Sequence, residues 1–277
     1  MSAVARTVCA VVLPRPGHGG AGPVLAALRA QSRAPDETVV VDQRASGVAL
    51  SGALGSGSEW LWLLDGDAVP EPRALEHLVA ALDAAKALPA PVLLTGKVLA
   101  PDGSLDPRSL PVAEVVRSDL VVGAVGRRLL AVRVARRGSL LVHRRAFERP
   151  PGAAACAPLD DDLAWTAGLL KHEPGLLVPA SVAVRTGPAW GGATPAGSEH
   201  TRAGAYASRA ELGRWLRLLS GDALAPRERA WFGFRLAELA LATARTRLSR
   251  LTESRRELRW RRWLRRRRWT RWTRRRR

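Results

Sequence analysis

Residues 59–70 read EWLWLLDGDAVP, an apolar run that ends in two acids, Asp65 and Asp67. A short apolar run bounded by turn residues predicts a buried strand, so both acids should lie where that strand leaves its sheet. In an open α/β sheet this is the end at which ligands bind. Two carboxylates so close together repel each other unless a cation holds them, and a divalent ion that bridges to substrate phosphates is a common solution. The stretch predicts a metal-diphosphate site, and the alternative is an ordinary acidic turn before Pro70.

Apolar segments of two kinds alternate along most of the chain. Short runs bounded by turn residues predict strands, and runs with an apolar residue every three or four positions predict helices. Strands that alternate with helices predict an α/β fold with a doubly wound, mainly parallel sheet. From about residue 208 the pattern is that of helices alone. The predicted strands cover residues 8–13, 38–42, 60–65, 91–98, 121–134, 138–142 and 175–184, and helices begin near Val24 and Leu75.

The positive charge of the chain is concentrated at one end. The 277 residues carry a formal net charge of +19, and residues 255–277 hold fourteen arginines against one glutamate. This segment contributes +13 and leaves +6 for the remainder, so the rest of the chain is only mildly basic. A chain of this length fits one sizeable domain, or one domain plus an appendage.

Four tryptophans stand among these arginines, and such a mixture binds anionic surfaces. Arginine pairs with phosphate, and an indole ring can insert at a bilayer interface or stack on a nucleic-acid base. The segment therefore suggests an anionic membrane surface as a partner, with nucleic acid as the lesser option. A disordered end without a dedicated partner fits as well, because long blocks of like charge are usually disordered.

The apolar segments and the cysteines bear on location. No stretch of eighteen uncharged apolar residues occurs, so no membrane-spanning helix is expected. Residues 8–13 are too short for the core of a signal peptide, and no cleavage site follows them, so a cytoplasmic protein is expected. The two cysteines, Cys9 and Cys156, do not suggest a disulfide framework.

The order of five motifs carries a family resemblance. Each motif is short, but five in sequence are hard to produce by accident. They are AALRAQS at residues 26–32, the run that ends at Asp42, the Asp-x-Asp at 65–67, GSLLVHRRAF at 138–147 and DDDLAW at 160–165. In this order, over about residues 7–186, the chain resembles the family 2 glycosyltransferases, which have the GT-A fold that binds nucleotide-diphospho-sugars. The resemblance implies transfer of a sugar to an acceptor hydroxyl with inversion.

The resemblance also implies which residues hold the donor. Asp65 and Asp67 would hold Mg²⁺ or Mn²⁺, which would neutralise the departing diphosphate. Asp65 would help to hold the ion directly, or through water and the ribose of the nucleotide. Asp42 would contact the base or the sugar of the nucleotide, and Leu13 and Pro14 would line the same pocket.

The acids at 160–162 are the implied catalytic group. The resemblance makes Asp160 the base that accepts the proton of the acceptor hydroxyl, and it aligns Asp162 with the second acid of the motif. Repulsion among adjacent acids can raise the pKa of one of them toward a useful range. From the residues alone, the preferred interpretation is an acidic first turn that caps the helix carrying Trp165, and the resemblance is what favours catalysis.

The chain also departs from the family in ways that suggest a shortened and divergent member. The interval from Asp42 to Trp60 is much shorter than in the family. Arg185 follows the predicted strand 175–184, where the family often has a histidine available to the metal. Arginine cannot ligate a cation, although it could clamp a phosphate. These departures favour a second hypothesis, a catalytically weakened or inactive binding or scaffold protein at the membrane surface.

Together, the resemblance and the charge distribution divide the chain into three predicted parts. Residues 1–207 would form the GT-A-like domain, 208–254 a helical segment, and 255–277 a tail that is disordered or associated with a membrane surface. The expected partners are a nucleoside-diphosphate sugar and an acceptor glycan or lipid-linked sugar. The expected location is the cytoplasm, peripheral on the inner face of the plasma membrane, with a role in cell-envelope polysaccharide or glycolipid synthesis.

Overall fold

The computed structural model describes residues 6–14, 20–41, 55, 57–106, 109–148, 161–186, 209–234 and 237. The predictions for Asp42, Cys156, Asp160 and residues 255–277 lie outside these ranges. Within them, no helix is both long and apolar enough to cross a membrane. Cys9 is buried in the first strand.

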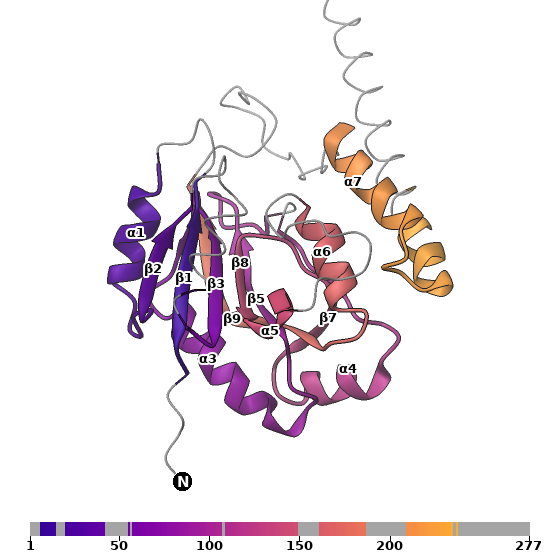
Figure 1. The fold of residues 1–277 in the computed structure, drawn as a ribbon, viewed down its shortest axis with the longest axis horizontal. Coiled ribbons are helices and arrows are strands. Elements are labelled where there is room, and N and C mark those ends of the chain that lie inside the picture. Colours follow the sequence, from indigo (N-terminus) through magenta and orange to yellow (C-terminus); the bar gives the residue numbers. More distant parts are fainter. Residues whose placement is uncertain are drawn as a thin grey trace, which may run out of the picture.

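Strands and helices alternate along the described chain (Figure 1). The strands are β1 (Val8–Leu13), β2 (Glu37–Val40), β3 (Trp60–Asp65), β4 (Ala68–Pro70), β5 (Leu93–Leu99), β6 (Val112–Ala113), β7 (Leu130–Val134), β8 (Ser139–His143) and β9 (Gly175–Arg185). The helices are α1 (Gly22–Arg29), α3 (Ala74–Ala84), the short 3-10 helix η2 (Ala85–Ala87), α4 (Ser118–Val125), α5 (Arg145–Glu148), α6 (Asp162–Leu169) and α7 (Arg209–Ser220). A further helical segment covers residues 226–234.

The described strands form one open sheet in the order β2-β1-β3-β8-β5-β9-β7-β6, and β4 pairs with β9 at one side of this path. β1 is parallel to β2 and β3, and β5 is parallel to β9. β8 and β7 run antiparallel to their neighbours, so the sheet is mixed. Helices cover both faces, and the predicted α/β class with a doubly wound sheet and C-terminal helices is confirmed.

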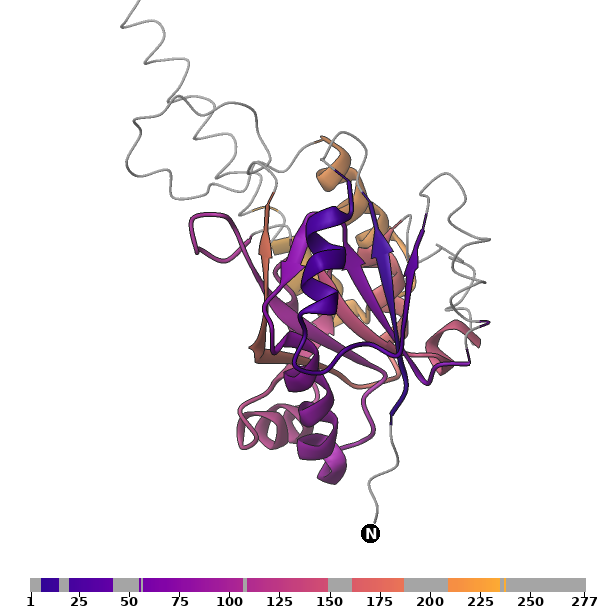
Figure 2. The ribbon, with the colours of Figure 1, turned by 90° about the vertical axis from the view of Figure 1, so that its left-hand side faces the viewer.

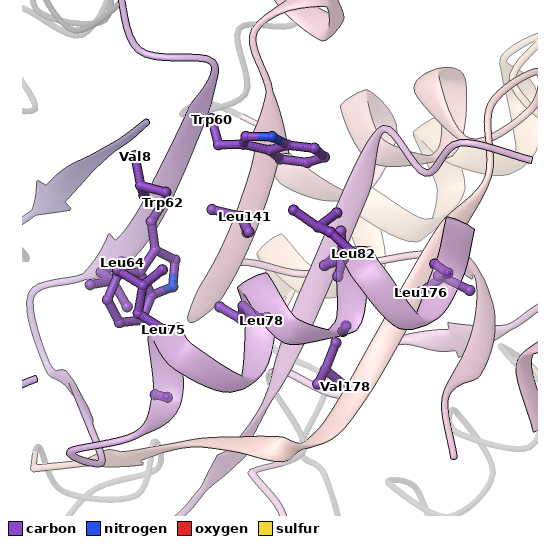
Figure 3. Close-up of a cluster of buried hydrophobic side chains, with 14 of the residues drawn as sticks. Val8, Trp60, Trp62, Leu64, Leu75, Leu78, Leu82, Leu141, Leu176 and Val178 are labelled. Atoms are coloured by element: carbon purple, nitrogen blue, oxygen red, sulfur yellow. The ribbon is translucent and has the colours of Figure 1, made fainter. Parts of the chain in front are cut away.

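Successive residues of β3 point to opposite faces of the sheet, and both faces are covered. Trp60 and Trp62 belong to the core cluster that includes residues of α1, α3 and α4. Figure 3 shows these two indoles on the α3 side of the sheet, with Leu75 from α3 beside Trp62. Leu61 and Leu63 belong to the opposite cluster, which α6 covers. Because neither face meets water, the strand carries no polar alternation and reads as a continuous apolar run.

α3 and α4 lie next to each other against one face of the sheet (Figures 1 and 2). The strand prediction for residues 121–134 is wrong in its first part, because residues 121–125 belong to α4. Leu120 and Ala124, four positions apart, are buried against the sheet, whereas Val122 and Val125 are exposed. The preference of valine for strands is weak, and packing of one helical face on the core overrides it. The strand begins only at Leu130.

The C-terminal helices pack on α6. Leu218, Leu224 and Phe232 form a third buried cluster with Leu163 and Ala167 of α6. The helical pattern predicted from residue 208 onward is confirmed over α7 and residues 226–234.

Candidate functional site

The two acids of the Asp-x-Asp lie at the turn between β3 and β4. Asp65 is the last residue of β3, and Asp67 directly precedes β4. Asp65 is 1% exposed and Asp67 is 2% exposed. The Gly66 N–H donates to the Leu13 carbonyl at 2.8 Å. A Cβ at Gly66 would lie 2.8 Å from the Cα of Pro14, so glycine is what lets the turn approach the end of β1 so closely.

Leu13 and Pro14, which the resemblance places in the nucleotide pocket, form the wall behind this turn. The Leu13 side chain is buried in the core cluster under α6. The Leu13 carbonyl and the Pro14 backbone therefore contact the turn, while the leucine side chain contributes to the core.

Strand pairing places Arg185 beside the two acids. β4 pairs antiparallel with the end of β9, so that Ala68 lies opposite Arg185. The Thr186 N–H donates to the Asp67 carbonyl at 2.8 Å, which extends this pairing by one residue. The last residue of β9 is thereby held against the β3–β4 turn.

The Arg185 guanidinium contacts three carboxylates. Its Nη2 donates to Asp65 Oδ2 at 3.0 Å, and its Nε donates to Asp106 Oδ2 at 2.5 Å. Its Nη1 makes a short hydrogen bond to Asp67 Oδ1. The four side chains are between 1% and 3% exposed. We call Asp65, Asp67, Asp106 and Arg185 the Arg185 cluster.

The charge of Arg185 is held firmly by its neighbours. Burial lowers the pKa of Arg185, but the attraction of Asp65, Asp67 and Asp106 outweighs burial and raises the pKa above its usual range. The guanidinium therefore keeps its proton more firmly than an ordinary arginine side chain.

Asp106 and Ser109 are site residues that the sequence analysis missed. Both are buried in the segment that follows β5, and the Arg185 Nη2 also donates to Ser109 Oγ at 2.7 Å. The Asp106 N–H donates to the Val98 carbonyl at 3.0 Å, which turns its segment back toward the sheet. No local pattern marks Asp106, because it is neither in a motif nor at the end of a predicted strand.

Asp162 reaches the same edge of the sheet through Arg137. The Arg137 N–H donates to Asp162 Oδ2 at 2.8 Å, and the Arg137 Nε lies 3.7 Å from Asp65 Oδ1. Thr166, one turn along α6, accepts from the Ala135 N–H at 3.2 Å and donates to the Ala135 carbonyl at 2.7 Å. The start of α6 is therefore fastened to the β7–β8 connection beside the Arg185 cluster.

Asp161 has the capping role that the residues alone suggested. It is the N-cap of α6, and its Oδ1 accepts from the Ala164 N–H at 3.2 Å. Its Oδ2 accepts from Arg217 Nη2 of α7 at 3.1 Å. Asp162 is the first residue of the helix and is 8% exposed. The catalytic assignment to Asp160 falls on a residue outside the described ranges.

As arranged, these residues do not fit a divalent cation. Mg²⁺ requires oxygen ligands at about 2.0–2.1 Å around one point, and Asp65 and Asp67 instead direct an oxygen each at the Arg185 guanidinium. Within the described ranges, no group of three or more His, Cys, Asp or Glu side chains could hold a metal ion.

Comparisons with known proteins gave no sequence match, since neither a protein-family model nor a curated protein matches the chain. Solved structures with a similar fold include A197 from STIV (TM-score 0.42, 15% identity, covering 70% of this chain and 100% of that one). S. aureus TarS is similar with a TM-score of 0.46 and 12% identity over 83% of this chain and 43% of TarS. The structure of GalNAc-T7 with UDP, GalNAc and Mn²⁺ is similar with a TM-score of 0.45 and 12% identity, over 70% of this chain and 46% of GalNAc-T7.

The chain thus matches less than half of the TarS and GalNAc-T7 chains. With TM-scores below 0.5 and identities of 15% or less, these similarities assign no role to any residue of this chain.

Proposed function

We propose that this chain is a glycosyltransferase that moves a sugar from a nucleoside-diphosphate sugar to an acceptor hydroxyl with inversion. The observation that carries the proposal is the meeting of Asp65, Asp67 and Asp162 around Arg137 and Arg185 at one edge of the sheet. These acids come from two of the five motifs that resemble family 2 glycosyltransferases, and that edge is where α/β sheets bind ligands.

In the proposed reaction, the acceptor oxygen attacks the anomeric carbon of the sugar. A bond forms between these two atoms, the bond from the anomeric carbon to the phosphate oxygen breaks, and the nucleoside diphosphate leaves with the electron pair. The acceptor proton passes to a carboxylate of the 160–162 motif, with Asp160 as the proposed base. The configuration at the anomeric carbon inverts because attack and departure take place on opposite sides.

We infer that Arg137 meets the leaving group. Its side chain is 17% exposed and lies beside Asp65, while its backbone holds Asp162. A guanidinium can bind two phosphate oxygens at once and offset the charge that develops on the diphosphate. Arg137 is therefore our candidate for the positioning of the diphosphate.

The proposed acceptor is a glycan or a lipid-linked sugar, which would place the reaction in cell-envelope polysaccharide or glycolipid synthesis. The Arg/Trp composition of residues 255–277 supports a location in the cytoplasm at the anionic inner face of the plasma membrane. Nucleic acid is the lesser alternative partner of that segment.

A second candidate function is binding of the nucleotide sugar without catalysis. The contacts of Arg185 favour it, because this side chain engages both acids of the Asp-x-Asp. In that case the domain would act as a binding or scaffold protein at the membrane surface.

One experiment separates these functions. The full chain is titrated calorimetrically with nucleoside diphosphates, and donor sugars are then tested for transfer and hydrolysis. The transferase proposal expects binding together with turnover, and Asp160→Asn, which removes the proposed base, should lose turnover while it retains nucleotide binding. Asp119→Asn, on the exposed side of α4, is the matched control and should change neither. Binding without turnover supports the second candidate, and no binding to any nucleotide contradicts both.

A further inference from the structure

The Arg185 cluster gathers charge from three separate places in the chain. Asp65 ends β3, Asp67 precedes β4, and Asp106 follows β5. Three carboxylates that are at most 3% exposed repel one another and have lost the solvent that would screen them. Such a group requires a cation, and the question is which cation this chain supplies.

The Arg185 guanidinium meets this requirement geometrically. Each of its three nitrogens donates to a different carboxylate, and Nη2 also donates to Ser109. A metal ion would need the oxygens of Asp65 and Asp67 directed at one point. The guanidinium lies between Asp65 Oδ2 and Asp67 Oδ1, so a metal ion cannot take both of these oxygens while Arg185 is in place.

The backbone keeps Arg185 in this place. The β4–β9 register sets it opposite Ala68, and the Thr186 N–H bond to the Asp67 carbonyl follows directly. Withdrawal of the side chain would leave Asp65, Asp67 and Asp106 buried without this partner. The position of Arg185 is thus fixed by the pairing of β4 with the end of β9.

We propose that Arg185 is the resident cation of this cluster, so that the site takes no divalent metal ion and binds a nucleoside diphosphate without one. The first part concerns the cluster itself. The second part, on the nucleotide, rests on the proposed function. Arg137, beside Asp65 and partly exposed, is then the residue that faces the diphosphate.

The first test measures Mn²⁺ binding to the full chain by electron paramagnetic resonance. The expected result is that the wild-type chain and Asp67→Asn give the same binding curve, because neither takes Mn²⁺ at the cluster. One Mn²⁺ bound per wild-type chain, and lost in Asp67→Asn, overturns the proposal.

The second test removes the arginine. Arg185→Ala leaves three carboxylates around an open position, so Mn²⁺ should raise its Tm while it leaves the Tm of the wild type unchanged. Arg133→Ala, which removes another buried arginine elsewhere, is the matched control and should show no rise. A folded Arg185→Ala chain that gains no Mn²⁺ site counts against the proposal. If this variant does not fold, the wild-type measurement decides.

The third test repeats the nucleoside diphosphate titration in EDTA and in Mn²⁺. Equal affinity in the two buffers supports the proposal. Binding in Mn²⁺ alone overturns it but leaves the proposed glycosyltransferase function standing. Absence of binding in both buffers contradicts the proposed function, while the two Mn²⁺ tests still decide what occupies the cluster.

Discussion

Two buried arginines, Arg185 and Arg133, link different parts of this protein, and they bind different partners. Arg185 is bound by three carboxylates at the edge of the sheet. Arg133 of β7 is bound by the single carboxylate of Glu228, at 2.6 Å from Nε, and by the carbonyls of Ala167 and Ala223, each at 2.6 Å. We call Arg133 with these three partners the Arg133 cluster.

The difference lies in the balance of charge. Glu228 matches Arg133 one to one, and the two carbonyls accept from further N–H groups of the guanidinium. This cluster therefore joins α6 and the C-terminal helices to the sheet without surplus charge. The Arg185 cluster gathers more carboxylates than one guanidinium neutralises. An arginine that only links parts of the fold does not need three acidic partners. Each additional buried carboxylate costs desolvation free energy. The surplus of acids is therefore what distinguishes the candidate site from ordinary packing.

The largest expected effect is that of Arg185→Ala. Removal of one partner from a buried ion pair costs about 3–5 kcal/mol in the free energy of unfolding, because charge is left buried without compensation. Arg185→Lys should lose less stability than Arg185→Ala because it keeps the positive charge. It should still be less stable than the wild type, because a lysine cannot contact three carboxylates in the same way. Denaturant unfolding measures both variants, and an alanine variant as stable as the wild type would show that the cluster does not need its cation.

Arg133→Ala should cost about 2–3 kcal/mol, because charged hydrogen bonds to Glu228 and two carbonyls are lost. The effect should be local, so that amide hydrogen exchange rises over residues 209–234 and hardly changes in β3. Equal acceleration in β3 would mean that the two clusters are not independent.

Gly66→Ala tests the geometry of the Arg185 cluster without a change of charge. The added Cβ would lie 2.8 Å from the Pro14 Cα, which must move, and the expected cost is about 1–3 kcal/mol. Gly126→Ala is the matched control, since its nearest neighbour would be 3.7 Å away, and it should leave stability close to that of the wild type. Thermal unfolding compares the two, and equal melting temperatures would argue against the close approach of β1 to the turn.

Asp161→Ala should cost about 1 kcal/mol through loss of the N-cap of α6. Arg217 contributes little to this figure, because its side chain is 64% exposed. Asp161→Asn keeps an oxygen for the Ala164 N–H and should retain most of the stability in urea unfolding. If Asn is as damaging as Ala, the ion pair and not the cap is the important contact.

The smallest effect concerns Glu114, which lies outside both clusters. Burial raises the pKa of Glu114, but hydrogen bonds from the Val116 N–H and the Arg117 side chain outweigh it and leave the pKa below its ordinary value of 4.5. A depressed carboxyl pKa adds stability above pH 4.5 that is lost as the pH falls through the folded-state pKa. Glu114→Gln should therefore show less loss of stability than the wild type on acidification, measured by urea unfolding from neutral to acidic pH. If the stability of the variant and of the wild type falls equally with pH, the Glu114 carboxyl does not contribute to the pH dependence of stability.

Part of the site could be predicted because it depends on local pattern. The apolar run before Asp65 identified a buried strand, and the acidic turn that follows it identified the end of that strand. The acidic start of α6 was identified as either cap or catalytic group, and Asp161 is the cap. The valine-rich residues 121–125 misled the strand prediction, because there the burial of one helical face and not residue preference decides the element.

The sequence by itself therefore determined the α/β class, the strand that carries Asp65 and the turn that carries Asp67, since these follow from the spacing of apolar and turn residues. It also showed an arginine at 185. Only the tertiary structure placed Arg185 between Asp65, Asp67 and Asp106, because that position depends on the β4–β9 register and on the return of the segment after β5. Pairings between distant segments leave no periodic signal in the chain, so the identity of the cation in this cluster is a property of the folded state.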